Sequence, residues 1–315
     1  MADIVKKATR ESYGQALVDL AEEFPDLVVL DADLAAATKT GGFKKAYPDR
    51  FFDCGIAESN MMGIAAGLAT TGKTVFASSF AMFAAGRAFE QVRNSIGYPH
   101  LNVKIGATHA GISVGEDGAT HQCCEDLALM RTIPGMTVIC PADDNESRQA
   151  VRAAIEMNGP VYLRFGRLAV ENVTPADYKF EIGKGVVLKD GTDVTLIANG
   201  LLVGEAVKAA ERLSAEGISA RVIDMATIKP LDRDLVLAAA KETGAIVTAE
   251  EHNIIGGLGS AVAEVTGEAC PVPVLRVGVQ DTFGKSGPAA DLLPLFGLSA
   301  DAIVEKAKAA VALKK

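Results

Sequence analysis

The chain of 315 residues lacks three features that would assign it to a broad class of proteins. It has no basic run, and its net charge of -9 argues against a nucleic-acid-binding surface. Charge or glycine interrupts every apolar stretch well before the ~20 residues that a membrane span requires. The amino terminus carries no apolar segment of the kind found in a signal peptide. We therefore expect a cytoplasmic protein that binds neither nucleic acid nor a membrane.

Cysteine is also scarce. The five residues are odd in number and form no Cys-x-x-Cys pair, which argues against a disulfide framework and against a zinc site: Cys54, Cys123, Cys124, Cys140 and Cys270. The four histidines are too scattered for a metal triad, so we expect no metal ligands on this chain. The adjacent Cys123 and Cys124 are either redox-sensitive or, as is commoner for a free cysteine, part of the core.

Apolar, β-branched runs alternate with amphipathic helical stretches along the chain. The first half predicts buried strands at 27–30, 74–77, 103–106, 137–140 and 161–164, and helices that include 12–23 and 145–157. The second half predicts strands at 194–198, 220–223, 245–249 and 274–277, and a helix at about 202–216. This alternation predicts an α/β fold of two domains, each a mostly parallel sheet with helices on both faces.

A change in composition separates the two halves. Residues 173–193 contain Pro175, several charges and several glycines, and they predict a linker with a short hairpin. We expect a first domain over residues 1–175, a linker over 176–192 and a second domain over 193–315.

The second domain contains a glycine-rich turn, Gly-Gly-Leu-Gly-Ser at 256–260, ahead of a predicted helix. Helix N-termini attract anions, so a phosphate cradle is one interpretation. The turn lacks the Lys-Ser/Thr of a P-loop and the spacing of a dinucleotide fingerprint, which favours a structural tight turn.

Residues 54–69 place one acidic side chain, Glu58, at the start of an otherwise apolar, small-residue helix. Four residues recur there at helical spacing, and we expect their face to be buried: Met61, Ile64, Ala65 and Leu68. Such surroundings disfavour ionisation of a carboxyl group and suit it to proton exchange with a bound cofactor. The alternative is an ordinary helix-start carboxylate that interacts with the helix dipole.

Further segments follow Glu58 in a fixed order. They are an aromatic-bearing stretch at 74–89, Gly-Ala-Thr-His-Ala-Gly at 106–111, Gly-Glu-Asp-Gly-Ala at 115–119 and Ile-Lys-Pro-Leu-Asp at 228–232. Together with the Ile-Ala-Glu-x-Asn element around Glu58, they make the chain similar, over nearly its whole length, to the middle and C-terminal portions of transketolase, a thiamine diphosphate enzyme. The resemblance implies the pyrimidine-binding and C-terminal domains of that family, and transfer of ketol groups between sugar phosphates.

The chain departs from the family in one respect. A full-length transketolase resembles it only in its second half, whereas the first half holds the diphosphate and Mg²⁺ through Gly-Asp-Gly and a later Asn. This sequence contains no Gly-Asp-Gly. The resemblance therefore implies the C-terminal subunit of a split transketolase, with thiamine diphosphate and Mg²⁺ as cofactors. An N-terminal subunit would complete an α2β2 heterotetramer, and only that complex would be active.

The resemblance also implies a cofactor site. Glu58 matches the carboxyl group that hydrogen-bonds the pyrimidine ring, and Phe80 and Phe83 match the aromatic residues that stack on it. Asp33 matches an acid close to the cofactor, with helix N-capping as the alternative role.

For the substrate, Arg10, His109 and Arg167 match residues that bind the sugar and its phosphate. Asp117 and His121 match groups that contact hydroxyls near the reacting carbon, so His109 and His121 join Glu58 as candidate catalytic residues. A surface ion pair is the alternative for each arginine, and a solvated loop position is the alternative for His121.

Two positions qualify this assignment. Arg164 is a near competitor of Arg167 for the phosphate. Ala37 stands where many relatives have a phosphate-binding Ser, and Thr38 or Thr40 is the candidate replacement.

Two rival interpretations stay open. A β subunit of a 2-oxo acid dehydrogenase, or a relative of deoxyxylulose-phosphate synthase, shares the Glu58 helix and the C-terminal domain. A non-catalytic assembly subunit would keep the fold alone. The histidines, Asp117 and the two arginines favour phosphorylated sugars as substrates.

Overall fold

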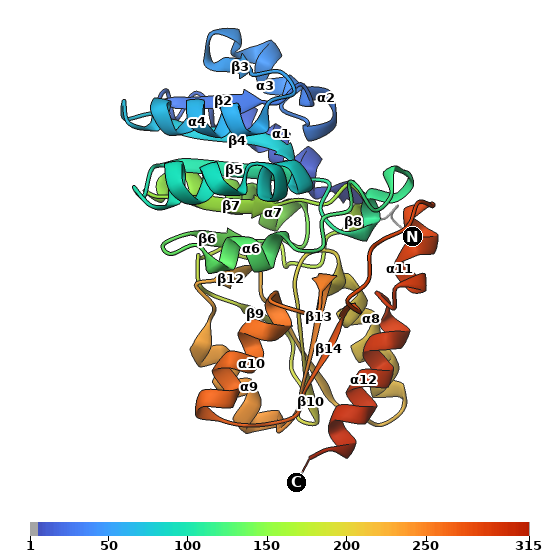
Figure 1. The fold of residues 1–315 in the computed structure, drawn as a ribbon. Coiled ribbons are helices and arrows are strands. Elements are labelled where there is room, and N and C mark those ends of the chain that lie inside the picture. Colours follow the sequence, from blue (N-terminus) through green and yellow to red (C-terminus); the bar gives the residue numbers. More distant parts are fainter. Residues whose placement is uncertain (1–5, 315) are drawn as a thin grey trace.

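Two open β-sheets lie one above the other in the computed structural model, which describes residues 6–314 (Figure 1). Apart from β12, the strands of the upper sheet come from the first half of the chain and those of the lower sheet from the second half, and helices cover both faces of each sheet. The predicted two-domain α/β fold is confirmed. Among residues 6–314, no helix has the length and apolar character needed to cross a membrane.

The first sheet has the strand order β12-β6-β7-β5-β4-β2-β3. Its parallel strands are β2 (Leu27–Asp31), β3 (Phe51–Asp53), β4 (Thr74–Phe80), β5 (Val103–Thr108), β6 (Thr137–Ile139) and β7 (Val161–Arg164). All residues of β2, β5 and β7 are buried, as expected for parallel strands that helices cover on both faces.

Helices form one layer on each face of this sheet. One layer is built from α1 (Thr9–Leu20), α3 (Gly41–Ala46) and α7 (Asp144–Glu156), whose buried side chains share a core with Phe76. The other contains α4 (Glu58–Ala69), α5 (Phe89–Gln91), α6 (Asp126–Thr132) and the π-helical turns η2 (Met82–Arg87) and η3 (Val92–Gly97). Short elements α2 (Ala35–Thr38), η1 (Pro48–Arg50) and η4 (Ile112–Asp117) lie in the connecting loops.

The second sheet has the order β14-β13-β10-β11-β9. Parallel strands β10 (Val194–Ala198), β11 (Ala220–Asp224), β13 (Ile246–Asn253) and β14 (Val274–Val279) form its body. The helices α8 (Leu202–Ala215), α11 (Ala289–Leu295) and α12 (Ala300–Ala312) pack in one core, and α9 (Arg233–Thr243) and α10 (Leu258–Ala269) in the other.

The structure corrects three details of the sequence analysis. Helix α1 begins at Thr9 and ends at Leu20 rather than spanning 12–23. The expected hairpin in the linker is wrong, because β9 (Val186–Lys189) pairs antiparallel with the distant β11. Ile64 is 39% exposed, whereas the buried face of α4 includes Met61, Met62 and Ala65.

Four strands of three residues each were missed, and one of them is β3 at the edge of the first sheet. β1 (Lys6–Ala8) pairs with β8 (Ala169–Glu171) in a separate two-stranded ribbon. β12 (Thr227–Lys229) follows β11 in the chain but pairs antiparallel with β6 of the first sheet. The second half of the chain therefore extends the first sheet, which fixes the two domains to each other.

A buried ion pair strengthens this junction. Arg164, at the end of β7, donates from Nε to Asp126 Oδ2 at 2.8 Å, and from Nη2 to the backbone oxygen of Glu251 in β13 at 2.9 Å. Side-chain exposure is 4% for Arg164 and 0% for Asp126. Burial alone would raise the pKa of Asp126, but the charge and hydrogen bonds of Arg164 outweigh it and lower that pKa.

Three acidic residues meet beside the same junction. Glu146 of α7 accepts hydrogen bonds from the Ala142 amide and the Tyr178 hydroxyl, each at 2.7 Å. Neither side-chain oxygen of Asp224 has a hydrogen-bond partner among the described residues. The negative charges of Glu146 and Asp143 repel a negative charge on Asp224. Burial followed by this repulsion raises the pKa of Asp224 well above its usual range, so we expect a proton shared with Glu146.

This shared proton predicts a pH-dependent stability. The folded chain keeps a proton that the unfolded carboxyl groups release near pH 4, so the free energy of unfolding falls as pH rises above that value. The loss is at most about 1.4 kcal/mol per pH unit. We expect Asp224→Asn, whose amide donates to Glu146 without a proton to lose, to flatten this dependence and to stabilise the chain most at pH 8.

Urea unfolding between pH 5 and pH 8 measures the effect. Asp177→Asn, a change at an exposed carboxyl next to Tyr178, is the matched control and should run parallel to the wild type. Parallel pH profiles for Asp224→Asn and the wild type would show that no proton is shared at this position.

Candidate active site

The candidate residues lie where the central strands of the first sheet end. Glu58 is the first residue of α4, Phe80 is the last residue of β4, His109 directly follows β5, and Arg167 comes three residues after β7. The carboxyl ends of parallel strands meet at one edge of a sheet, which is where ligands bind in open α/β folds. Arg10 reaches the same place from the first turn of α1.

Glu58 is 1% exposed, so its side chain is buried at the start of α4. Its surroundings are not purely apolar, however. Arg87, the last residue of η2, donates from Nη1 to Glu58 Oε2 at 2.8 Å. The buried carboxylate therefore has a cationic partner that the sequence analysis did not identify.

Aromatic rings form a wall beside Glu58. The rings of Phe80 and Phe83 are stacked with centroids 5.9 Å apart, and the His109 ring stacks on Phe80 at 3.9 Å. The His121 ring meets Phe83 edge-on at 5.3 Å. The structure thus brings together two predicted aromatic residues from the end of β4 and from η2 with two predicted catalytic histidines that follow β5.

His109 is held as a neutral imidazole. Arg10 donates from Nη1 to His109 Nε2 at 2.9 Å, so Nε2 is an acceptor and the ring proton lies on Nδ1, facing Thr108 Oγ1 at 2.9 Å. Burial, and then the charges of Arg10, Arg167 and Lys39, lower the pKa of His109 to about 3.

The two predicted phosphate-binding arginines share one electrostatic environment. Arg10 also donates to the Ala37 carbonyl at 2.9 Å, and its Nε has no partner among the described residues. Burial and the charge of Arg167 lower the pKa of Arg10, although Glu11 opposes them. Arg167 is 38% exposed and pairs with Glu116 at 2.8 Å.

The loop between residues 111 and 118 approaches Arg167 closely. Gly115 has φ of 85°, a conformation that glycine adopts without strain, and Arg167 donates to the Val114 carbonyl beside it. Arg164, by contrast, is buried in the domain junction, so it is not available to a phosphate. Asp117 is exposed at the end of η4, and His121 is half-buried.

The candidate residues in and around α2 divide into two groups. Asp33 is exposed, and it does not cap α2, because Asp31 Oδ1 accepts from the Leu34 amide at 2.6 Å. The hydroxyls of Thr38 and Thr40 are buried and donate to Asp31 Oδ2 at 2.7 and 2.8 Å. Both hydroxyls are therefore engaged within the chain rather than presented to a ligand.

Comparison with known proteins identifies the family of the chain. Residues 5–172 match a family model described as the pyrimidine binding domain of transketolase, and residues 183–303 match the transketolase C-terminal domain. The chain belongs to the transketolase family. The chain contains the pyrimidine binding domain and the C-terminal domain of that family.

Three similar proteins are informative. A solved split-gene transketolase, described as an inactive β4 tetramer, is 58% identical, with a TM-score of 0.92 over 98% of this chain and 99% of that one. A 6-deoxy-6-sulfo-D-fructose transketolase subunit of Clostridium sp. is 45% identical over 95% of this chain and 92% of its own length. An apulose-4-phosphate transketolase subunit of Phocaeicola vulgatus is 40% identical over 95% of this chain and 96% of its own length.

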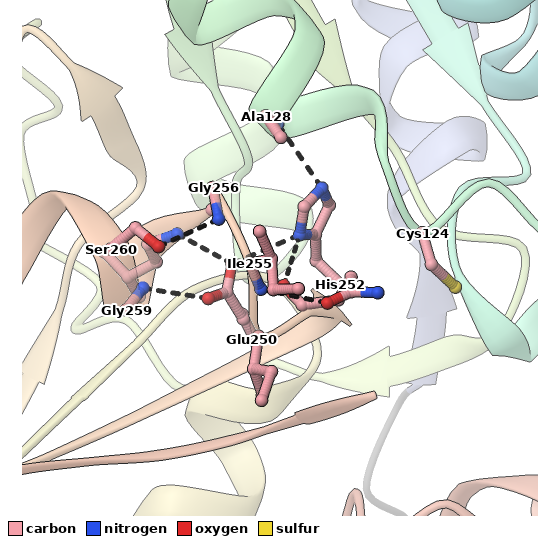
Figure 2. A network of polar contacts seen from close by, with 12 residues as sticks. Cys124, Ala128, Glu250, His252, Ile255, Gly256, Gly259 and Ser260 are labelled. Atoms are coloured by element: carbon pink, nitrogen blue, oxygen red, sulfur yellow. Dashed lines mark hydrogen bonds and ion pairs between the residues drawn. The ribbon is translucent and has the colours of Figure 1, made fainter. Parts of the chain in front are cut away.

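The glycine-rich turn at 256–260 is already occupied by a carboxylate of the chain itself (Figure 2). Glu250 accepts from the Leu258 amide at 2.7 Å and the Gly259 amide at 2.8 Å, so it satisfies the N-terminus of α10 where a phosphate would bind. A Cβ atom on Gly257 would overlap Glu250 Oε2. These contacts support the structural interpretation of the turn.

The same turn joins the two domains. The amide of Ala128 in α6 donates to His252 Nε2 at 3.3 Å, and Arg131 donates to the Gly256 carbonyl at 2.5 Å. A Cβ atom on Gly256 would approach Ala128 Cβ to 2.6 Å. The glycines therefore allow both the close capping by Glu250 and the close approach of α6.

Sequence reasoning missed Arg87 and Glu250. Arg87 lies within the aromatic-bearing stretch at 74–89, and nothing in the sequence shows that its side chain reaches Glu58. Glu250 precedes the glycine turn by only a few residues. The available signal for its role was the acidic sequence Ala-Glu-Glu-His at 249–252, which follows an apolar strand. Among residues 6–314, no group of three or more His, Cys, Asp or Glu side chains is placed to hold a metal ion.

We expect Gly257→Ala to destabilise the chain, because the added methyl group displaces Glu250 from the N-terminus of α10. Losing charge-assisted hydrogen bonds of this kind costs about 1.5–3 kcal/mol. Urea unfolding of the purified chain measures the change. Gly267→Ala in the same helix meets no atom within 4 Å and should instead stabilise by about 0.5 kcal/mol. Equal stability of Gly257→Ala and the wild type would contradict the capping role.

Proposed function

We propose that this chain is the C-terminal subunit of a two-component transketolase that moves a two-carbon ketol unit between sugar phosphates. The observation that carries the proposal is the meeting, at one sheet edge, of a buried carboxylate, an aromatic wall and a neutral histidine with two arginines. Each of these groups suits a different part of the reaction.

The residues around Glu58 fit the pyrimidine ring of thiamine diphosphate, the cofactor that transketolases use. When bound, this cofactor supplies the nucleophilic carbon of ketol transfer. The guanidinium of Arg87 already shows that a flat hydrogen-bond donor fits against Glu58. Glu58 would hold a proton at the pyrimidine ring nitrogen, Phe80 and Phe83 would support the ring face, and exposed Asp33 would lie at the margin of this site.

The residues around His109 suit an anionic sugar. Arg10 and Arg167 would bind the phosphate, since guanidinium groups form paired hydrogen bonds with its oxygens. His109 is neutral at physiological pH, so it can exchange hydrogen bonds with a sugar hydroxyl or carbonyl without adding charge. His121 and Asp117 would contact the hydroxyls near the reacting carbon.

A partner would supply the other half of the site. The sequence has no Gly-Asp-Gly with which to hold the diphosphate through Mg²⁺, and we assign that role to an N-terminal subunit in an α2β2 heterotetramer. The names of the relatives support this assignment, because two are called subunits and the solved β4 tetramer is described as inactive.

Two alternatives are separable by experiment. A 2-oxo acid dehydrogenase β subunit or a relative of deoxyxylulose-phosphate synthase would act on a 2-oxo acid rather than a ketose donor. An assembly subunit would restore no thiamine-dependent turnover with any partner.

Reconstitution tests the proposal. We expect the chain alone to be inactive with thiamine diphosphate, Mg²⁺ and a ketose phosphate donor, and the complex with its N-terminal subunit to be active. In the complex, Glu58→Gln should lower kcat at least about a hundredfold, because an amide cannot exchange the proton of the pyrimidine nitrogen. A coupled assay of aldose phosphate release measures both results. Robust turnover by the single chain would contradict the need for a partner subunit. A near-normal kcat for the variant would contradict the role of Glu58.

The phosphate role of the arginines predicts a substrate-dependent defect. Arg167→Ala and Arg10→Ala should lower kcat/KM for phosphorylated sugars roughly ten- to hundredfold, because a charge-assisted hydrogen bond to the anion contributes about 1.5–3 kcal/mol. Short unphosphorylated aldoses as acceptors should be affected much less. Arg152→Ala, a change at a partly exposed arginine of α7 that pairs with Glu23, is the control and should leave both values unchanged. An equal loss for both substrate classes would mean that the arginines hold the scaffold.

A further inference from the structure

Arg87 makes two contacts, one at the edge and one at the face of its planar guanidinium group. Its Nη1 donates to Glu58 Oε2 at 2.8 Å, and its Cζ lies 4.5 Å from the centroid of the Phe83 ring. No other hydrogen-bond donor reaches the Glu58 carboxylate among the side chains and amides of residues 6–314. The guanidinium is therefore held by the carboxylate at its edge and the aromatic ring at its face.

These two contacts are the ones that the proposed function gives to the pyrimidine ring. A guanidinium and an N-protonated aminopyrimidine are both planar and delocalised, and both present N–H donors along one edge. Each can stack on an aromatic face while it donates to a carboxylate. Two such groups cannot hold the same oxygen and the same ring face at once.

We infer that Arg87 occupies the place of the cofactor's pyrimidine ring in the free chain and must leave before the cofactor can bind. The inference rests on the proposed function, because it takes Glu58 and Phe83 as the pyrimidine site.

The exposure of the two partners shows which one moves. Glu58 is 1% exposed at the start of a packed helix, whereas the Arg87 side chain is 51% exposed. Arg87 ends the π-helical turn η2, and its backbone carbonyl is held by Ser59 Oγ at 3.4 Å, so the side chain can rotate outward while the backbone stays. While the site is without cofactor, the guanidinium compensates the buried charge of Glu58, which would otherwise be costly. Arg87 thus stabilises the free subunit and weakens cofactor binding.

The test is the affinity of the reconstituted complex for thiamine diphosphate with saturating Mg²⁺, measured by titration calorimetry. Arg87→Met keeps the length of the side chain but removes the donors. We expect it to lower the Kd about tenfold, because a competing charge-assisted hydrogen bond no longer has to be broken. The same variant should lower the melting temperature of the free chain. Arg93→Met, a change at an exposed arginine of the adjacent turn η3, is the matched control and should alter neither value.

The outcomes separate this inference from the proposed function. If the wild-type complex binds the cofactor and Arg87→Met has an unchanged or higher Kd, the inference alone is overturned. Arg87 would then either support the bound cofactor or lie outside the pyrimidine site. No binding by either complex would overturn the proposed function and the inference with it. Tighter binding by Arg87→Met, with Arg93→Met like the wild type, is the result expected.

Discussion

The buried pair of Arg164 and Asp126 is the interaction on which the arrangement of the two domains depends. It lies where β7 ends and α6 begins, and Arg164 continues across the junction to the Glu251 carbonyl of β13. Breaking a buried pair by removing one partner typically costs about 3–5 kcal/mol, because the other charge is left uncompensated. The geometry of the site is tied to this pair, since Arg167 follows Arg164 by three residues and the 111–118 loop is anchored by the Ser113 amide on Glu251 at 2.5 Å.

The junction explains why so many charged groups of the second domain are buried. Glu250, Glu251 and His252 are consecutive residues of β13, and all are at most 4% exposed. Each has a separate function in the structure. Glu250 caps α10, Glu251 holds the 111–118 loop, and His252 accepts a hydrogen bond from the Ala128 amide of α6. The C-terminal domain thus acts on the candidate site indirectly, by fixing loops that belong to the first domain.

The candidate site itself separates charges by environment. Arg10 and Arg167 lie near His109, where burial and then their charges lower its pKa and keep the imidazole neutral. Glu58 is linked to the aromatic rings through Arg87, its one cationic partner among the described residues, which stacks on Phe83, is half exposed and has a flexible side chain. A rigid carboxylate opposed by a movable cation is an arrangement in which a ligand can replace the cation without disturbing the core.

The sequence alone determined the α/β class, the two-domain order, the central strands and the set of residues near the sheet edge, because alternating apolar runs and strand-end motifs are local signals. It did not determine the three-residue strands β1, β8 and β12, since so short a strand depends on its distant partner for hydrogen bonds. It placed Ile64 in the core because helical spacing marks an apolar face without showing whether a neighbour covers it.

Only the tertiary structure distinguished buried Arg164 from accessible Arg167, engaged the Thr38 and Thr40 hydroxyls with Asp31, and set Arg87 on Glu58. Each of these outcomes depends on contacts that side chains make once the chain is folded, and residue spacing carries no information about such contacts.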